Sequence, residues 1–141
     1  MGTLVDPWPN GFSISEEQVA VMLREVQQHA QEEACGLVVR VGADTLRVYP
    51  ITNALHSLVR FYMQPEELLS VFSEVDEKGW ELTAIYHSHL KGPAVPSFTD
   101  IAEFRYPGIV SLIWSPVGES WTCRAFLISG QEFHEIPIEV F

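Results

Sequence analysis

The sequence predicts a single compact α/β domain, in which helices flank one mixed and mainly antiparallel sheet. Three observations support this fold class. The chain has 141 residues, which is enough for one domain to bury a core without disulfide or metal staples. Hydrophobic residues make up 47% of the chain, too large a share for a disordered protein. Segments with a helical period and short β-prone segments follow one another with no internal repeat and no linker.

The first predicted helix follows an irregular N-terminal leader. Residues 1–12 contain two prolines and two glycines, so we expect the leader there and the folded domain over residues 13–141. Ser15 is a favourable N-cap, and Gln18 stands three residues later, as in a capping box. Apolar residues with a 3.6-residue period then continue, which predicts a helix with one buried face that ends near Gln31.

Short strands and a second helix are expected next. Residues 34–41 and 45–49 are β-prone and are separated by a turn, which predicts two successive strands, and residues 60–63 are a third strand candidate. A second helix is predicted to begin at Pro65, which suits a first turn, and to end before Gly79, which suits the position after the last helical residue. The side chains expected on its buried face are Leu68, Leu69, Phe72 and Val75.

The C-terminal half begins with the strand that carries the main motif. A nearly continuous apolar run over residues 82–86 predicts a central strand that is covered on both faces and ends at His87. A loop rich in glycine and proline follows, and then a short helix over residues 97–104. Further strands, separated by turns, are expected over residues 109–114, 121–128 and 132–138.

The composition opposes several classes of function. The formal net charge is −11 with only eight basic residues, which disfavours binding to the phosphates of DNA or RNA. No apolar run is long enough to cross a bilayer, and residues 1–15 lack the basic and apolar regions of a signal peptide. The two cysteines, Cys35 and Cys123, do not form a disulfide framework, so we expect a cytoplasmic protein with reduced thiols.

The most informative pattern is His87-Ser88-His89, seven residues, Ser97, two residues and Asp100. Residues two apart on a strand point to the same side, so both imidazoles can reach one ion. The intervening loop can fold the next helix start over the strand end, where Asp100 completes a His2Asp set. Such a set holds zinc and leaves a fourth tetrahedral position open, as catalytic zinc sites do. Taken alone, Ser97 and Asp100 would equally describe a structural helix start.

A catalytic zinc site needs a group that accepts a proton from the coordinated water. The candidates are Glu32 and Glu33, and the alternative for either residue is an exposed charge at a helix end. If Cys35 lies on one strand with Glu33, the two residues share a face, and the thiol could approach the metal as a fourth ligand that closes the site. The alternative for Cys35 is a small buried apolar side chain.

These residues resemble the JAMM (MPN+) metalloprotease family. The family pattern is an upstream glutamate, then H-S/T-H, seven residues, S, two residues and D, and residues 87–100 match it in full. Residues 33–37, E-A-C-G-L, are similar to the E-x-C-G-L stretch of small prokaryotic members, which selects Glu33 over Glu32 as the base. The resemblance covers roughly residues 15–128 and is to the small prokaryotic type, such as desampylases and sulfur-carrier-processing peptidases.

The resemblance implies an MPN/JAMM-like fold, which is cytidine-deaminase-like, and a zinc-dependent hydrolase. Such an enzyme cleaves an isopeptide or peptide bond after the C-terminal glycine of a ubiquitin-like or sulfur-carrier protein, whose Gly-Gly tail lies beside a sheet edge as an added strand. His87, His89 and Asp100 would bind Zn2+, and Glu33 would take a proton from the zinc-bound water that attacks the carbonyl. Ser97 would hydrogen-bond the oxyanion of the tetrahedral intermediate.

Two departures from the family pattern refine this expectation. Many members have proline after the second histidine, whereas Leu90 and Lys91 follow here, which alters the rim of the cleft and not the ligands. The chain also lacks the long insertions with which eukaryotic members grip ubiquitin, which favours a small bacterial or archaeal enzyme acting on a thin Gly-Gly tail. The alternative function is a non-catalytic MPN scaffold that binds ubiquitin-like proteins or partner subunits. An amidohydrolase barrel needs about 250 residues, more than this chain has.

Overall fold

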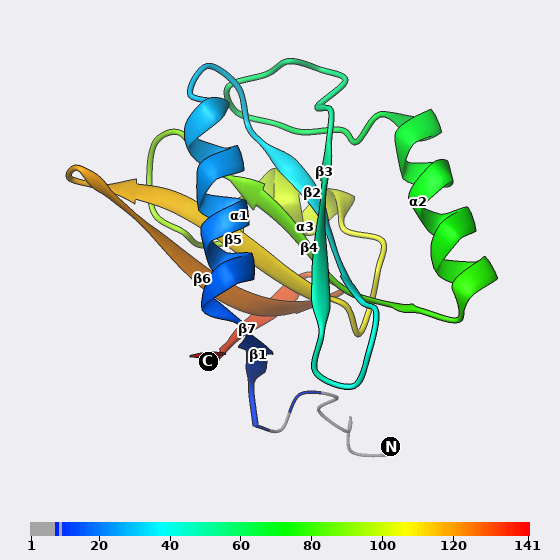
Figure 1. The fold of residues 1–141 in the computed structure, drawn as a ribbon. Coiled ribbons are helices and arrows are strands. Elements are labelled where there is room, and N and C mark those ends of the chain that lie inside the picture. The colour runs from blue at the N-terminus through cyan, green and yellow to red at the C-terminus, as the bar shows by residue number, and fades with distance from the viewer. Residues whose placement is uncertain (1–7, 9) are drawn as a thin grey trace.

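A six-stranded sheet forms the centre of the computed structural model, which describes Trp8 and residues 10–141 (Figure 1). Its strands in chain order are β2 (Cys35–Arg40), β3 (Leu46–Ile51), β4 (Glu81–Ser88), β5 (Val110–Val117), β6 (Ser120–Ser129) and β7 (Glu132–Ile136). They lie side by side in the order β3-β2-β4-β5-β6-β7, and within this sheet only β4 and β5 run parallel. The predicted mixed and mainly antiparallel sheet is therefore confirmed.

A second sheet of two strands joins the two ends of the described chain. Strand β1 (Phe12–Ile14), which the sequence pattern did not predict, pairs in parallel with β8 (Ile138–Val140). The single strand predicted over residues 132–138 is wrong at its end, because Pro137 separates β7 from β8. Proline has no N–H for a strand ladder, and the Pro137 carbonyl instead accepts a hydrogen bond from Phe12 N at 2.8 Å.

The first helix begins where its cap predicts. Of the leader expected over residues 1–12, residues 1–7 and 9 lie outside the described residues. Helix α1 (Glu16–Gln28) starts after Ser15, whose hydroxyl accepts a hydrogen bond from Gln18 N at 3.3 Å. The serine N-cap is therefore confirmed, although the helix ends three residues before the expected position.

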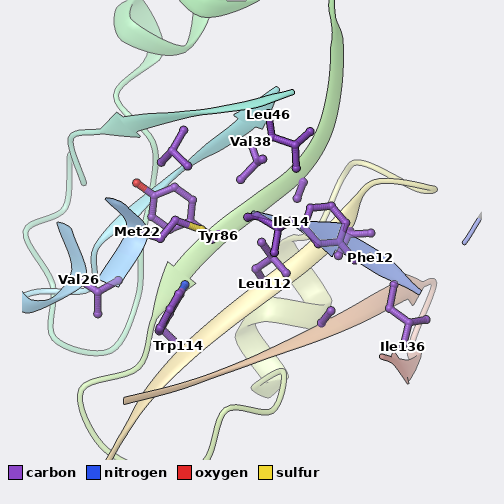
Figure 2. Close-up of a cluster of buried hydrophobic side chains, with 14 of the residues drawn as sticks. Phe12, Ile14, Met22, Val26, Val38, Leu46, Tyr86, Leu112, Trp114 and Ile136 are labelled. Atoms are coloured by element: carbon purple, nitrogen blue, oxygen red, sulfur yellow. The ribbon is translucent and has the colours of Figure 1, made fainter. Parts of the chain in front are cut away.

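Helix α1 packs across one face of the six-stranded sheet, and Figure 2 shows the apolar cluster between them. Met22 and Val26 are the buried residues of the helix, and they face Tyr86 of β4 and Trp114 of β5. The cluster also fixes β1 and β8 against the sheet. Other members are Phe12, Ile14, Val38, Leu112 and Ile136. This face is filled by apolar side chains, so the polar chemistry of β4 lies on the opposite face.

Helix α2 (Pro65–Lys78) covers part of that opposite face. It begins at Pro65 and ends at Gly79, whose φ of 68° is the left-handed conformation that favours glycine. Three of the four side chains predicted to face the core do so, namely Leu68, Phe72 and Val75. The prediction for Leu69 is wrong, since this side chain is 64% exposed. Val71 lies three residues after Leu68 and four before Val75, so it, and not Leu69, occupies the centre of the apolar stripe.

The strand predicted over residues 60–63 is wrong. The structure has only an isolated bridge between Asn53 and Met63, and the chain between them folds as a loop. Tyr62 N donates to the Asn53 side chain, and Tyr62 O accepts a hydrogen bond from Ala54 N. The backbone groups that a strand would offer to a neighbour are thus used inside the loop.

The end of β4 meets the start of a short helix. Strand β4 lies between β2 and β5, which confirms its central position, and it continues to Ser88. Helix α3 (Phe98–Glu103) lies on the crossover from β4 to the parallel β5 and begins directly after Ser97, as predicted. Among the described residues, no helix combines the length and the apolar character that crossing a bilayer requires.

Candidate metal centre

The two histidines of the motif lie side by side at the end of β4. His87 pairs with Cys35 on β2 and with Ile113 on β5, and it is only 2% exposed. His89 follows the strand, is 8% exposed, and is held by a hydrogen bond from its backbone N–H to Trp114 O. Because residues two apart on a strand point the same way, their Nε2 atoms come within 3.2 Å of each other.

Asp100 reaches the same point from the first turn of α3. Its Oδ2 atom lies 3.2 Å from His87 Nε2 and 3.0 Å from His89 Nε2. A full capping box holds the aspartate in place, because Ser97 N donates to Asp100 Oδ2 and Ser97 Oγ accepts from Asp100 N. The capping box that starts α3 therefore also brings the Asp100 carboxylate to the two histidines, so the structural and the metal-binding interpretation of Ser97 and Asp100 do not exclude each other.

The three converging atoms fit a tetrahedral metal ion. Zinc bonds to imidazole nitrogen and carboxylate oxygen are about 2.0–2.2 Å long, so two ligand atoms of a tetrahedral site lie roughly 3.3–3.5 Å apart. The three separations here are 3.0–3.2 Å. His87, His89 and Asp100 can thus contact one ion together, and they leave its fourth position open.

Neighbouring groups fix the orientation of these ligands. His89 Nδ1 lies 2.9 Å from Pro93 O and donates to it, which leaves the Nε2 lone pair directed into the site. The Phe61 ring stacks on the His87 ring with centroids 4.5 Å apart. Burial opposes ionisation of Asp100, but the interactions of its carboxyl with the imidazoles of His87 and His89 outweigh it and hold the pKa of this carboxyl well below its usual range. The aspartate is therefore anionic at neutral pH, which suits it to contact a cation.

Glu33 is a buried carboxyl beside these ligands. It is 3% exposed and lies two residues before the start of β2, and its Oε1 atom has no hydrogen-bond partner among the described residues. Burial raises the pKa of Glu33 to about 8, while the charge of His89 opposes this rise and that of Asp100 adds to it. An unpaired buried carboxyl oxygen is costly, and a water molecule or a ligand at the site would satisfy it.

Glu32 turns away from the site. Its carboxylate lies 2.9 Å from His56 Nδ1 and 3.8 Å from His29 Nδ1, both at partly or fully exposed positions. The electrostatic influence of His89 and Asp100 is felt at Glu33. Of the two candidates for a base, Glu33 is therefore the one whose pKa is affected by the charges of His89 and Asp100.

Ser97 and Cys35 differ in what they can offer the site. The Ser97 hydroxyl accepts from Asp100 N, and its own O–H remains available to donate to a bound molecule. Cys35 donates its thiol to Ile51 O at 3.4 Å, and burial raises the pKa of this thiol to about 12. The ligand group contains no cysteine, and Cys35 packs as a small side chain in the apolar cluster under α2.

A cavity of about 290 Å3 opens beside the ligands. It lies between the loop over residues 60–63 and helix α3, and His87 and Asp100 form part of its wall. An ion pair between Arg60 Nε and Glu103 Oε1, at 2.7 Å, joins these two sides. This loop was not expected at the site, because nothing in the spacing of residues 52–64 indicates that they approach the end of β4.

Comparisons with known proteins agree with this geometry. The model of the family described as prokaryotic homologs of the JAB domain matches residues 15–128. The chain is 33% identical to a desampylase of Pyrococcus furiosus over 82% of this chain and 81% of that protein. It is 39% identical to a probable TtuB-protein conjugate cleaving protease of Thermus thermophilus over 83% of this chain and 74% of the relative. The solution structure of a protein from Desulfitobacterium hafniense has a TM-score of 0.81 and 31% identity, and the match covers 92% of both chains.

Proposed function

Because the chain belongs to the family of prokaryotic homologs of the JAB domain, we propose that it is a zinc-dependent isopeptidase with residues 13–141 as its catalytic domain. Its reaction is hydrolysis of conjugates of ubiquitin-like proteins, in agreement with the named activities of both relatives. In finer detail, the bond cleaved follows the C-terminal glycine of a ubiquitin-like or sulfur-carrier protein with a Gly-Gly tail. A location in the cytoplasm is part of this proposal.

The observation that carries the proposal is the meeting of three ligand atoms beside a buried carboxyl. His87, His89 and Asp100 come within 3.0–3.2 Å of one another, and Glu33 is buried next to them with an unpaired oxygen. A structural zinc site has four protein ligands, whereas this set has three. A scaffold domain would have no use for such a set, so an enzyme is favoured over a non-catalytic MPN domain.

Each polar group has a role in the proposed reaction. A bound zinc ion would supply a Lewis acid, which lowers the pKa of coordinated water and polarises a carbonyl. Glu33 accepts a proton at its carboxylate and later donates it to the leaving amine, as a general base and then a general acid. Ser97 donates its O–H to the oxygen on which negative charge develops. His87, His89 and Asp100 would hold the zinc ion between these groups.

The substrate tail needs a route to a site that lies in the middle of the sheet. The edge strands of the six-stranded sheet are β3 and β7, whereas the ligands lie at the end of the central β4. The cavity between the loop over residues 60–63 and α3 opens at His87 and Asp100, so it offers the tail a way to the site. Glycine has no side chain, so a Gly-Gly tail can approach the buried ligands closely.

The test begins with the metal content and the products of the wild-type protein. The purified protein is expected to hold one zinc ion, measured by mass spectrometry of the metal, and to cleave a ubiquitin-like fusion from the same genome. Mass spectrometry of the fragments should show a new C-terminus at the last glycine. A protein that binds zinc and cleaves no fusion or conjugate would instead support the scaffold function.

A further inference from the structure

Asn53 is a buried residue that ties the loop after β3 together. It is only 4% exposed, and its side chain uses all four of its hydrogen-bonding positions. Its Nδ2 atom donates to Glu33 O and to Arg60 O, both at 3.1 Å. Its Oδ1 atom accepts from Leu55 N and Tyr62 N, also at 3.1 Å. The Asn53 side chain therefore joins residues on both sides of the loop to the Glu33 backbone.

The same loop binds Glu33 a second time. The Glu33 backbone N–H donates to Ser57 O at 2.8 Å, while its carbonyl accepts from Asn53. Strand β2 begins only at Cys35, so the strand ladder does not hold Glu33. Both backbone groups of Glu33 are thus bound by the loop alone, and Asn53 is the part of the loop that reaches its carbonyl.

This matters for the Glu33 side chain because little else directs it. Its Oε1 atom has no hydrogen-bond partner in the described part of the chain. The direction of the carboxyl is therefore set by its backbone and by packing. A shift of about 1 Å in a catalytic group can reduce a rate about 10²-fold.

We propose that Asn53 is a positioning residue, which locks the backbone of Glu33 to the loop and so fixes its carboxyl for proton transfer. This inference rests on the proposed function, because it assigns Asn53 to the same reaction. It also has a consequence for the loop. A molecule that moves the loop would also shift the Glu33 backbone, because the loop holds both of its hydrogen-bonding groups.

Two variants separate the two halves of the Asn53 side chain. Asn53→Asp has the same shape and keeps the oxygen that accepts from Leu55 and Tyr62, but it loses the donors to Glu33 and Arg60. Asn53→Ala loses all four bonds. Thr83→Val is the matched control, since Thr83 is 1% exposed and donates one buried hydrogen bond to Val38 O at 3.0 Å. This bond does not involve the Glu33 backbone, whose partners are Ser57 and Asn53.

In both Asn53 variants we expect kcat to fall about 10–10²-fold while KM and zinc content change little. Thr83→Val should lower the melting temperature and leave kcat unchanged. If Asn53 acts through Glu33, adding Asn53→Ala to the Glu33→Gln variant should cause little further loss, and an additive loss would overturn the proposal. A wild-type kcat in the folded Asn53→Asp variant would overturn it as well.

A measurement without substrate distinguishes this inference from the proposed function. Amide hydrogen exchange by NMR should be faster at Glu33 in Asn53→Asp than in wild type, because the Glu33 N–H is bonded to Ser57 O of the loop, and Asn53 joins this loop to the Glu33 carbonyl. The amides of Leu55 and Tyr62 should stay protected. Unchanged amide exchange at Glu33 overturns the proposal that Asn53 holds this backbone, whatever the activity of the variant. If the wild type cleaves no conjugate, the proposed function fails, and exchange at Glu33 still decides whether Asn53 holds this backbone. If Asn53→Ala does not fold, Asn53→Asp carries both tests.

Discussion

Ser88 and Ala34 are joined by two hydrogen bonds, one from the Ala34 N–H to Ser88 Oγ at 2.8 Å and one from the Ser88 N–H to Ala34 O at 3.0 Å. Ser88 stands between the two histidine ligands, and Ala34 directly follows Glu33. The pair therefore links the strand end that carries both histidines to the residue next to the proposed base. Its side-chain bond extends the contact of β2 and β4 past the last ladder pair, Cys35 with His87.

Replacement of this serine should affect both stability and activity. Ser88 is fully buried, so Ser88→Ala leaves the Ala34 N–H without its acceptor, which costs about 1–3 kcal/mol in free energy of unfolding. We expect kcat to fall as well, with zinc content retained, because the ligands themselves are unchanged. Chemical denaturation, metal analysis and steady-state kinetics would check this. Equal stability of variant and wild type would show that this bond does not hold the two segments.

Loss of a ligand should abolish both zinc binding and its stabilising effect. In His87→Ala and in Asp100→Ala, two atoms remain of the three that converge within 3.2 Å. Zinc at about 100 times its dissociation constant stabilises a protein by about 2.7 kcal/mol. A chelator should therefore lower the melting temperature of wild type, and added zinc should restore it. Neither variant should respond to chelator or zinc, and a variant that responds like wild type would mean that its residue is not a ligand.

Ser97 has a structural and a catalytic contribution that one control can separate. Its hydroxyl caps α3, and loss of a cap costs about 0.5–2 kcal/mol, whereas loss of an oxyanion donor costs about 10²–10³ in kcat. We expect Ser97→Ala to show both losses. Ser15→Ala removes the corresponding cap of α1, so it should lower the melting temperature only. A near-normal kcat in Ser97→Ala would leave Ser97 with its capping role alone.

The helices and the convergence of His87, His89 and Asp100 could be predicted from the sequence because their causes are local. Ser15 and Ser97 bind backbone groups three residues away, and the direction of His87 and His89 follows from strand alternation. The prediction that Leu69 faces the core is wrong because the sequence pattern does not distinguish its position on α2 from that of the buried Val71. Packing against the sheet, which the local pattern does not contain, decides which of the two is buried.

The loop over residues 52–64 could not be predicted for the opposite reason. Its shape depends on one buried amide, Asn53, whose partners lie up to twenty residues away in the chain. The apolar residues at 60–63 resemble a strand in isolation, but their backbone groups bind the loop itself. The stacking of Phe61 on His87 and the cavity beside it follow from that loop and carry no sequence signal of their own.

Glu33→Gln should separate metal binding from turnover. Glutamine has nearly the same shape as glutamate but cannot accept and return a proton at neutral pH. Because the three ligands are unchanged, we expect the variant to retain wild-type zinc content and to lose its hydrolytic activity. Metal analysis and cleavage of the same fusion protein would be measured in parallel. A fully active variant would show that another group is the base.

The same substitution should also change how stability depends on pH. Burial raises the pKa of Glu33 from its usual 4.5 to about 8, so the folded state binds this proton more tightly than the unfolded state. Below about pH 4.5 the carboxyl is protonated in both states, so its burial requires no loss of charge. As the pH rises toward 8, the free energy of unfolding falls by up to about 1.4 kcal/mol for each unit by which the pKa is raised. Glutamine stays neutral throughout, so in zinc-free protein Glu33→Gln should melt at a higher temperature than wild type at pH 8 and not at pH 4. A constant difference for Glu33→Gln between pH 4 and 8 would mean that this carboxyl ionises as readily as an exposed one.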